Sequence, residues 1–266
     1  MQIFGYFASL LIGISLGLIG GGGSILTVPV LVYLFSVNPV LSTSYSLFVV
    51  GSTSLVGAFN NYLKGLVKIK TALLFGISSI TTVFLTRKIL IAHIPENFGS
   101  IGNFQVTESV LVMVLFAILM VVASLSMIRG SNNDLKQANG GNSKINLPKL
   151  LAYGIGIGFI TGLLGAGGGF LLIPTLVLLV KLPMKEAVGT SLFIIALNSL
   201  IGFTGDLGHF DIDWIFLLKI TAIAIVGIFI GGALNKKIHG DYLKKGFGWF
   251  VLVMGIYIIA HEIFIG

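Results

Sequence analysis

The first charged side chain of this 266-residue chain is Lys64. Uncharged apolar sequence of that length can lie in a lipid bilayer, but it leaves too little polar surface for a domain in water. The remainder is similar: 56% of the residues are hydrophobic, and 9% are charged where a soluble domain has about 25%. We therefore predict a polytopic membrane protein, which excludes a soluble enzyme, a coiled coil and a disordered chain.

Six apolar stretches have the length of about 20 residues that a helix needs to cross a bilayer. They are residues 41–62, 70–88, 106–128, 186–204, 213–235 and 246–265. Two longer stretches, 3–36 and 150–182, are interrupted near their middles by the glycine-rich clusters 20–23 and 165–169. Since helices pair their own backbone polar groups in lipid, the predicted fold class is an all-α polytopic membrane protein with two broken segments.

The two broken segments begin an internal repeat. Residues 17–59 align with residues 162–204 without a gap at an offset of 145, and 16 of the 43 positions are identical. The identities include Pro29 with Pro174 and the Ser-Leu-Phe sequence at 46–48 and 191–193. Chance matches among glycines and leucines do not explain a shared proline and tripeptide at one offset, so we infer two repeats.

Charge predicts the orientation of the repeats. Residues 64–70 carry three lysines and no acid, whereas the matching loop 206–213 carries three aspartates and no lysine or arginine. Lysine-rich loops face the cytoplasm, so the two loops are expected on opposite sides, with Arg87 and Lys88 left outside. This predicts inverted repeats at 1–128 and 149–266, each a re-entrant helical hairpin plus three transmembrane helices. A cytoplasmic linker (129–148) joins them, and both termini face outward.

The glycine clusters are the predicted substrate site. Proline is tolerated in the first turn of a helix, so short helices are expected to start near Thr27 and Leu172. The preceding residues 20–26 and 165–171 would then be non-helical, with unpaired amides at membrane depth. A bound anion is a natural acceptor for such amides. The alternative is that these glycines only allow close helix packing.

Polar side chains beside the clusters extend this prediction. Their hydroxyl and amide groups would complete an anion shell, or would instead bond backbone carbonyls between helices. Among the further candidates, the lysine is either a site residue or snorkels to the interface, and the aspartate is a candidate proton site. The predicted substrate-binding residues are Gly20, Gly21, Gly22, Gly23, Ser24, Pro29, Ser46, Gly165, Gly167, Gly168, Gly169, Pro174, Thr190 and Ser191, and the further candidates are Tyr45, Asn198, Lys219 and Asp206.

The sequence contains no recognisable catalytic motif. There is no cysteine, no nucleophile–base arrangement and no paired carboxylates, and the four histidines are scattered. We therefore predict no enzyme activity, no metal and no cofactor. The net charge of +7 is interpreted as cytoplasmic-loop bias and not as a nucleic-acid surface.

The segments 17–29, 162–174 and 189–193 (Gly-Thr-Ser-Leu-Phe) resemble the TauE/SafE family of sulfite exporters and related permeases for sulfonates and other organic anions. The resemblance covers essentially the whole chain. It implies a multi-spanning transporter in the plasma membrane of a bacterium or archaeon, with the two glycine-proline motifs, Thr190 and Ser191 at the site. One departure stands out: Tyr45 replaces the small threonine of the second half, which would narrow the pocket or change substrate preference.

Together these features predict a secondary transporter that moves sulfite or an organosulfonate by alternating access, with the two hairpin tips forming the site. The expected partners are a small anion and the lipid bilayer, while coupling protons or ions and a homo-oligomer are left open. An anion channel is the nearest alternative. A non-transport membrane enzyme or an assembly factor for another complex is the second.

Overall fold

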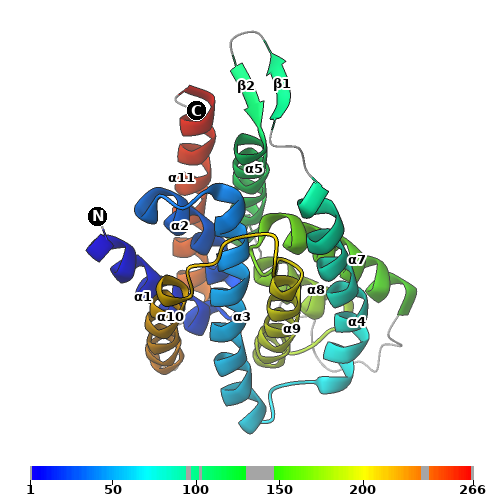
Figure 1. The fold of residues 1–266 in the computed structure, drawn as a ribbon. Helices are drawn as coiled ribbons and strands as arrows, with labels where there is room; N and C mark the ends of the chain where they lie inside the picture. Colours follow the sequence, from blue (N-terminus) through cyan, green and yellow to red (C-terminus); the bar gives the residue numbers. More distant parts are fainter. Residues whose placement is uncertain (1, 94–96, 102–103, 130–146, 235–239, 265–266) are drawn as a thin grey trace.

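The computed structural model describes the chain apart from residues 1, 94–96, 102–103, 130–146, 235–239 and 265–266, drawn as a thin grey trace in Figure 1. The described part is a bundle of ten α-helices. They are α1 (Gln2–Ile19), α2 (Thr27–Phe35), α3 (Pro39–Leu63), α4 (Ile69–Leu85), α5 (Glu108–Arg129), α7 (Leu147–Leu164), α8 (Gly169–Leu179), α9 (Met184–Thr204), α10 (Trp214–Leu234) and α11 (Gly240–Phe264).

Short elements complete the described chain. A 3₁₀ turn, η1 (Gly22–Leu26), precedes α2, and a π-helical turn, η2 (Thr86–Leu90), extends α4 into a further 3₁₀ turn, η3 (Ile91–His93). An antiparallel hairpin of β1 (Asn97–Ile101) and β2 (Phe104–Thr107) projects from the bundle before α5 (Figure 1). This hairpin was not predicted. It adds two strands to the predicted all-α class without entering the bundle.

Five predicted spans are confirmed as helices long and apolar enough to cross a membrane: α3, residues 69–90, residues 108–128, α9 and α10. The sixth predicted span, 246–265, falls in α11 up to residue 264, but α11 is not among these five, and residue 265 lies outside the described residues. Most of the predicted linker 129–148, namely residues 130–146, also lies outside them.

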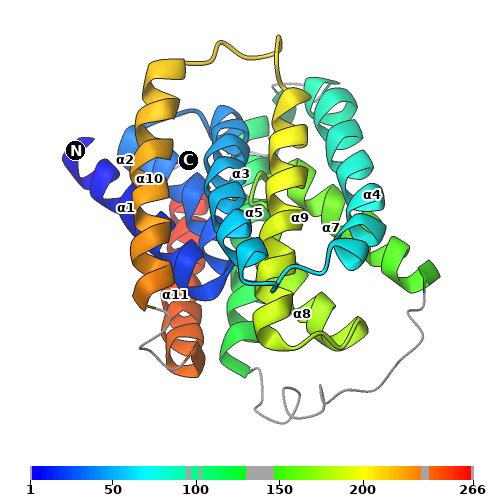
Figure 2. The same cartoon turned by 90° about the horizontal axis from the view of Figure 1, so that it is seen from below.

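Helices α3 and α9 form the centre of the bundle (Figures 1 and 2). Gly51 packs against Leu200 and Gly189 packs against Asn61, so the two helices run antiparallel. They are the most buried of the five spans and also carry about half of the buried hydroxyl side chains. A helix screened from lipid by its neighbours can carry such groups because they find partners on those neighbours.

Two parallel pairs flank this centre: α1 with α10 on one side, and α4 with α7 on the other (Figure 1). Close approach in the first pair depends on glycine. A Cβ on Gly13 would overlap the Ala224 carbonyl oxygen, and one on Gly231 would overlap the Ile14 carbonyl oxygen. Small residues of this kind let membrane helices pack backbone to backbone. Helices α5 and α11 form a third pair.

The first broken segment is a hairpin that returns to the face from which it entered. Its second arm, α2, ends at Phe35, whose ring packs on Gly5 and lies 5.4 Å, centroid to centroid, from Tyr6 at the start of α1. In the second segment, Leu150 near the start of α7 and Leu176 near the end of α8 share one cluster of buried apolar side chains.

The predicted helix starts are half right. Helix α2 begins at Thr27 as predicted, but residues 22–26 before it form the turn η1, so only residues 20–21 are non-helical. Helix α8 begins at Gly169, three residues before the predicted start at Leu172, with Pro174 inside the helix. Positive φ angles at three glycines between 165 and 168 complete the reversal, after which helix can resume. Pro174 then leaves one helical carbonyl without its usual donor.

The packing of α1 on α10 predicts different results for two adjacent glycines. In Gly231→Ala the new methyl group meets the backbone of α1, so we expect a loss of about 1–3 kcal/mol in stability. In Gly232→Ala the methyl group meets nothing within 4 Å, so stability should stay the same or rise through better helix propensity. Thermal melting of the two purified variants measures this, and equal melting temperatures would contradict the packing.

Candidate functional site at the two hairpin tips

The two glycine breaks meet inside the bundle. A Cβ on Gly21 would lie 2.9 Å from the Cα of Gly169 and 2.7 Å from Cδ1 of Ile195, so the two backbones are in contact. A Cβ on Gly167 would lie 2.7 Å from Cγ1 of Val50. Since Val50 and Ile195 are near the middles of α3 and α9, the tips meet about halfway along the two central helices.

Several buried amides at this meeting point have no acceptor within the described residues. The N–H groups of Gly20 and Gly165 still bond the carbonyls of Leu16 and Thr161, at 2.9 Å each. Those of Gly21 and of residues 166–168 donate to nothing among the described residues, although all four residues are buried. Buried backbone amides are otherwise almost always paired. Consecutive amides at left-handed glycines form a concavity suited to an anion.

Three buried hydroxyls in the bundle are unpaired within the described residues, and two of them lie at the second tip. Among the described residues, the buried Oγ of Ser54 and of Ser199 have no hydrogen-bond partner, nor has Oγ1 of Thr161. Ser199 Oγ would be 3.4 Å from a Cβ on Gly167, and Thr161 packs on Gly168. The sequence analysis missed these residues. Ser54 and Ser199 are identical positions of the repeat, and that signal was sufficient to find them.

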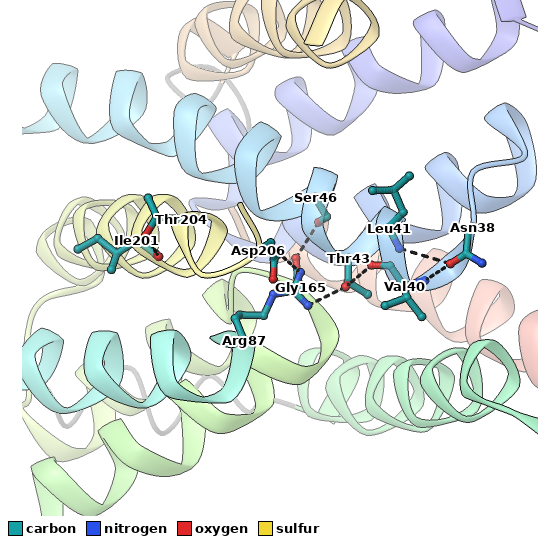
Figure 3. Close-up of polar contacts among 10 residues, drawn as sticks. All are labelled: Asn38, Val40, Leu41, Thr43, Ser46, Arg87, Gly165, Ile201, Thr204 and Asp206. Atoms are coloured by element: carbon teal, nitrogen blue, oxygen red, sulfur yellow. Dashed lines mark hydrogen bonds and ion pairs between the residues drawn. The ribbon is translucent and has the colours of Figure 1, made fainter. Parts of the chain in front are cut away.

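Other predicted hydroxyls are occupied by backbone carbonyls. Ser46 donates to the carbonyl oxygen of Gly165 at 2.7 Å, which fixes the second tip against α3 (Figure 3). Ser24 donates to that of Gly21 at 2.8 Å, and Ser191 donates within its own helix. Asn198 donates to Ser79 at 2.7 Å and keeps a buried Oδ1 without a partner among the described residues.

Thr190 and Tyr45 each accept a hydrogen bond from a backbone N–H just before the next helix. The backbone N–H of Lys68, just before α4, donates to Thr190 Oγ1 at 3.0 Å. The N–H of Asp213, just before α10, donates to the Tyr45 hydroxyl at 2.7 Å. Both acceptor–donor pairs are related by the same offset of 145 residues. The substitution of threonine by tyrosine therefore keeps a contact that holds the start of the next helix.

The remaining predicted residues lie around the tips or away from them. Pro29 is in the first turn of α2, and Gly20 packs on Val188 of α9. Gly22 faces Ile19 and Met127, and Gly23 faces Leu16, so neither lies at the contact between the tips. Lys219 is exposed on α10, which agrees with the snorkelling alternative.

A buried ion pair stands beside the second tip. Arg87, which we predicted on the outer side of the membrane, is fully buried in the bundle, within the turn η2 that continues α4. Its Nη2 lies 2.8 Å from Oδ2 of Asp206, and its Nη1 donates to Thr43 Oγ1 at 2.9 Å. The backbone of Thr43 packs directly on Gly165, so the pair and the tip are neighbours (Figure 3).

Burial makes the carboxyl of Asp206 easier to protonate than an exposed one. Burial raises the pKa of its carboxyl above the ordinary value, and this effect exceeds the opposing effects of Arg87, Ser44 and His209. The sequence did name Asp206 as a candidate proton site. It did not predict that Arg87 is buried beside Asp206, because an arginine at the end of a predicted span is normally expected at the membrane interface.

Among the described residues, no three His, Cys, Asp or Glu side chains are grouped so that they could hold a metal ion.

The architecture is that of a multi-pass membrane protein whose two glycine-rich hairpin tips meet in its buried centre. The model of one family, Sulfite exporter TauE/SafE, matches residues 6–258, so the chain belongs to that family. It is a transporter family and not an enzyme family. No solved structure matches the chain at a significant level.

Named relatives agree with this class. A "Probable membrane transporter protein" of Xylella fastidiosa (strain 9a5c) is 29% identical over 94% of this chain and 91% of its own length. The "Probable membrane transporter protein YunE" of Bacillus subtilis is 29% identical over 93% of each chain. A similar protein of Methanocaldococcus jannaschii is 24% identical over 94% of this chain and 92% of its own.

The Tyr45 contact predicts a stability effect without a change of shape. Tyr45→Phe removes the acceptor for the Asp213 N–H and keeps the ring, so we expect a loss of about 1 kcal/mol. Tyr62→Phe is the matched control, because that side chain is 53% exposed. Thermal melting measures both variants. If the Tyr45→Phe protein is as stable as the control variant, the hydrogen bond to Asp213 contributes nothing to stability.

Proposed function

We propose that this protein is a secondary transporter for small anions, with sulfite or an organosulfonate as substrate, and that the two hairpin tips bind the anion. The unpaired amides of Gly21 and residues 166–168 carry this proposal. Each buried amide without an acceptor costs several kcal/mol, and a bound oxyanion supplies acceptors for several of them at once. Ser199 and Thr161 add hydroxyl donors beside them.

Alternating access would follow from inverted repeats, 1–128 and 149–266, joined by a cytoplasmic linker at 129–148. Reciprocal contacts support the repeats. Gly20 packs on Val188, and at the same offset of 145 residues Gly165 packs on Thr43. The same exchange relates Gly13–Ala224 to Gly158–Ser79 and Gly57–Ile228 to Gly202–Val83. The antiparallel run of α3 and α9 supports their inversion. A site between inverted repeats can be opened to either face by tilting one repeat against the other.

The proposed orientation places both termini outside the bacterial or archaeal inner membrane. It is tested with the exposed, repeat-equivalent residues Lys64 and His209. Since the natural chain has no cysteine, Lys64→Cys and His209→Cys each introduce a single thiol. In intact cells an impermeant maleimide should label only the thiol at 209, and permeabilisation should expose the one at 64. Labelling of both from one side would contradict the inversion.

The proposed site is tested by sulfite and methanesulfonate flux into proteoliposomes. Gly167→Ala puts a methyl group between Val50 and Ile195, so flux should fall by about tenfold or more. Gly65→Ala is the matched control, because Gly65 has nearly the same φ (70° against 66°) but no heavy atom within 4 Å of its Cβ position. Equal flux in both variants would contradict the tip site.

A further variant separates binding from folding. Ser199→Ala removes a buried hydroxyl that has no partner among the described residues, so stability should be unchanged or higher. If the hydroxyl donates to the anion, the KM for sulfite should nevertheless rise several-fold. A variant that is more stable and equally active would return Ser199 to a packing role.

An anion channel remains the alternative function. It would give flux that does not saturate with substrate and does not respond to the gradient of a coupling ion, and the same proteoliposomes measure both properties. A membrane assembly factor would show no flux at all.

A further inference from the structure

We propose that Arg87 and Asp206 couple anion transport to protons: a proton that adds to Asp206 releases Arg87, which then takes the transported anion as its counter-ion. This inference rests on the proposed function.

The pair is buried but incompletely bonded. The side chains of Arg87 and Asp206 are 0% and 1% exposed. Nε of Arg87 and both carboxylate oxygens of Asp206 make no hydrogen bond of good geometry within the described residues. A guanidinium has five N–H donors, and here one donates to Thr43 while another faces the carboxylate. Such a pair adds little stability compared with apolar side chains, so a purely structural role explains it poorly.

The position of the pair brings it to the anion site. Thr43 receives the hydrogen bond from Arg87, and its backbone packs on Gly165, which precedes the amides of residues 166–168. Figure 3 shows the guanidinium of Arg87 directed toward Thr43 and Asp206. Within the described residues Arg87 is also the single buried cationic side chain. It is therefore the charge that an entering anion would meet.

The pair has no counterpart in the other repeat. The equivalent positions are Gly232 and Asn61, and the Asn61 side chain donates to the carbonyl of Gly57. On that face the charged contact is Lys68–Glu186 at 3.2 Å, whose side chains are 46% and 24% exposed. Water screens an exposed pair, so it exerts little control over an ion. The buried charge pair thus serves one face only.

Charge balance then sets the coupling. A buried guanidinium needs one negative partner at all times. When Asp206 is ionised, it is the negative partner of Arg87. An entering anion would then add a second negative charge that no buried cation balances. When a proton from the adjoining water adds to a carboxylate oxygen of Asp206, the acid becomes neutral, Arg87 stays cationic, and the anion completes the pair. One proton therefore accompanies one anion.

The neighbours of Asp206 permit this exchange. The charged or titratable side chains that act on it are Arg87 and His209. From α3 it meets the uncharged Ser44. Lys88 is turned away, with Nζ 5.4 Å from the ring centroid of Phe84.

The test is the pH dependence of methanesulfonate binding to the purified full chain, between about pH 5 and pH 8. This probe stays ionised throughout, so any pH slope belongs to the protein. Binding requires protonated Asp206, whose fraction falls about tenfold per pH unit above its pKa, so the apparent Kd of the natural protein should rise toward tenfold per unit. Asp206→Asn mimics the protonated acid and should bind tightly with no slope.

Two further variants keep the test sharp. Glu186→Gln alters the exposed pair and should keep the slope of the natural protein. The double variant Arg87→Gln, Asp206→Asn buries no unpaired charge, so it should fold, and its affinity should fall at least about tenfold at every pH. A slope that persists in Asp206→Asn, or a double variant with natural affinity, overturns the coupling. If the natural protein binds and transports neither sulfite nor methanesulfonate, the proposed function fails, and the coupling fails with it. Tight binding that is independent of pH overturns the coupling alone.

Discussion

Peptide N–H groups without acceptors, buried where two hairpin tips touch, are the constraint on which the rest of this structure depends. In a bilayer a helix pairs its own backbone, so a break in a helix exposes amides that water cannot reach. Here the breaks are held between α3 and α9, the two helices best screened from lipid. The short helices α2 and α8 exist because the chain must turn back after each break. In the proposed function the same unpaired amides receive the negatively charged substrate.

Glycine has two separate roles in this fold. The sequence suggested either a substrate site or close helix packing, and each interpretation applies to a different set of glycines. Gly13 and Gly231 let α1 and α10 pack backbone to backbone, and Gly22 and Gly23 face helices of their own repeat. Close packing accounts for these. Gly21 and Gly169, by contrast, bring the two tips into contact across the molecule. Sequence identity alone does not separate the two uses, because both require the absence of a side chain.

The contacts of the bundle are nearly symmetric, and its charges are not. Thr190 and Tyr45 hold equivalent amides in opposite halves, despite their different sizes. Arg87 and Asp206 have no such equivalent. Under the proposed mechanism, symmetric packing would let two arrangements of similar energy exist, whereas a single buried charge pair would make the two faces respond differently. A transporter needs both properties, since it must reach either face yet move its substrate in a defined direction.

Local sequence was enough to determine much of this protein. Hydropathy located the five spans, and glycine followed by proline located the breaks, because both signals act within a few residues of one segment. The family resemblance rested on the same motifs and was confirmed. Contacts between segments were another matter. Three features depend on which helix lies opposite. They are the start of α8 at Gly169, the burial of Arg87, and the hydrogen bond by which Tyr45 accepts from the backbone N–H of Asp213. Only the tertiary structure decided these, because the environment of a polar side chain in a membrane protein is set by its neighbours across the bundle and not by its own helix.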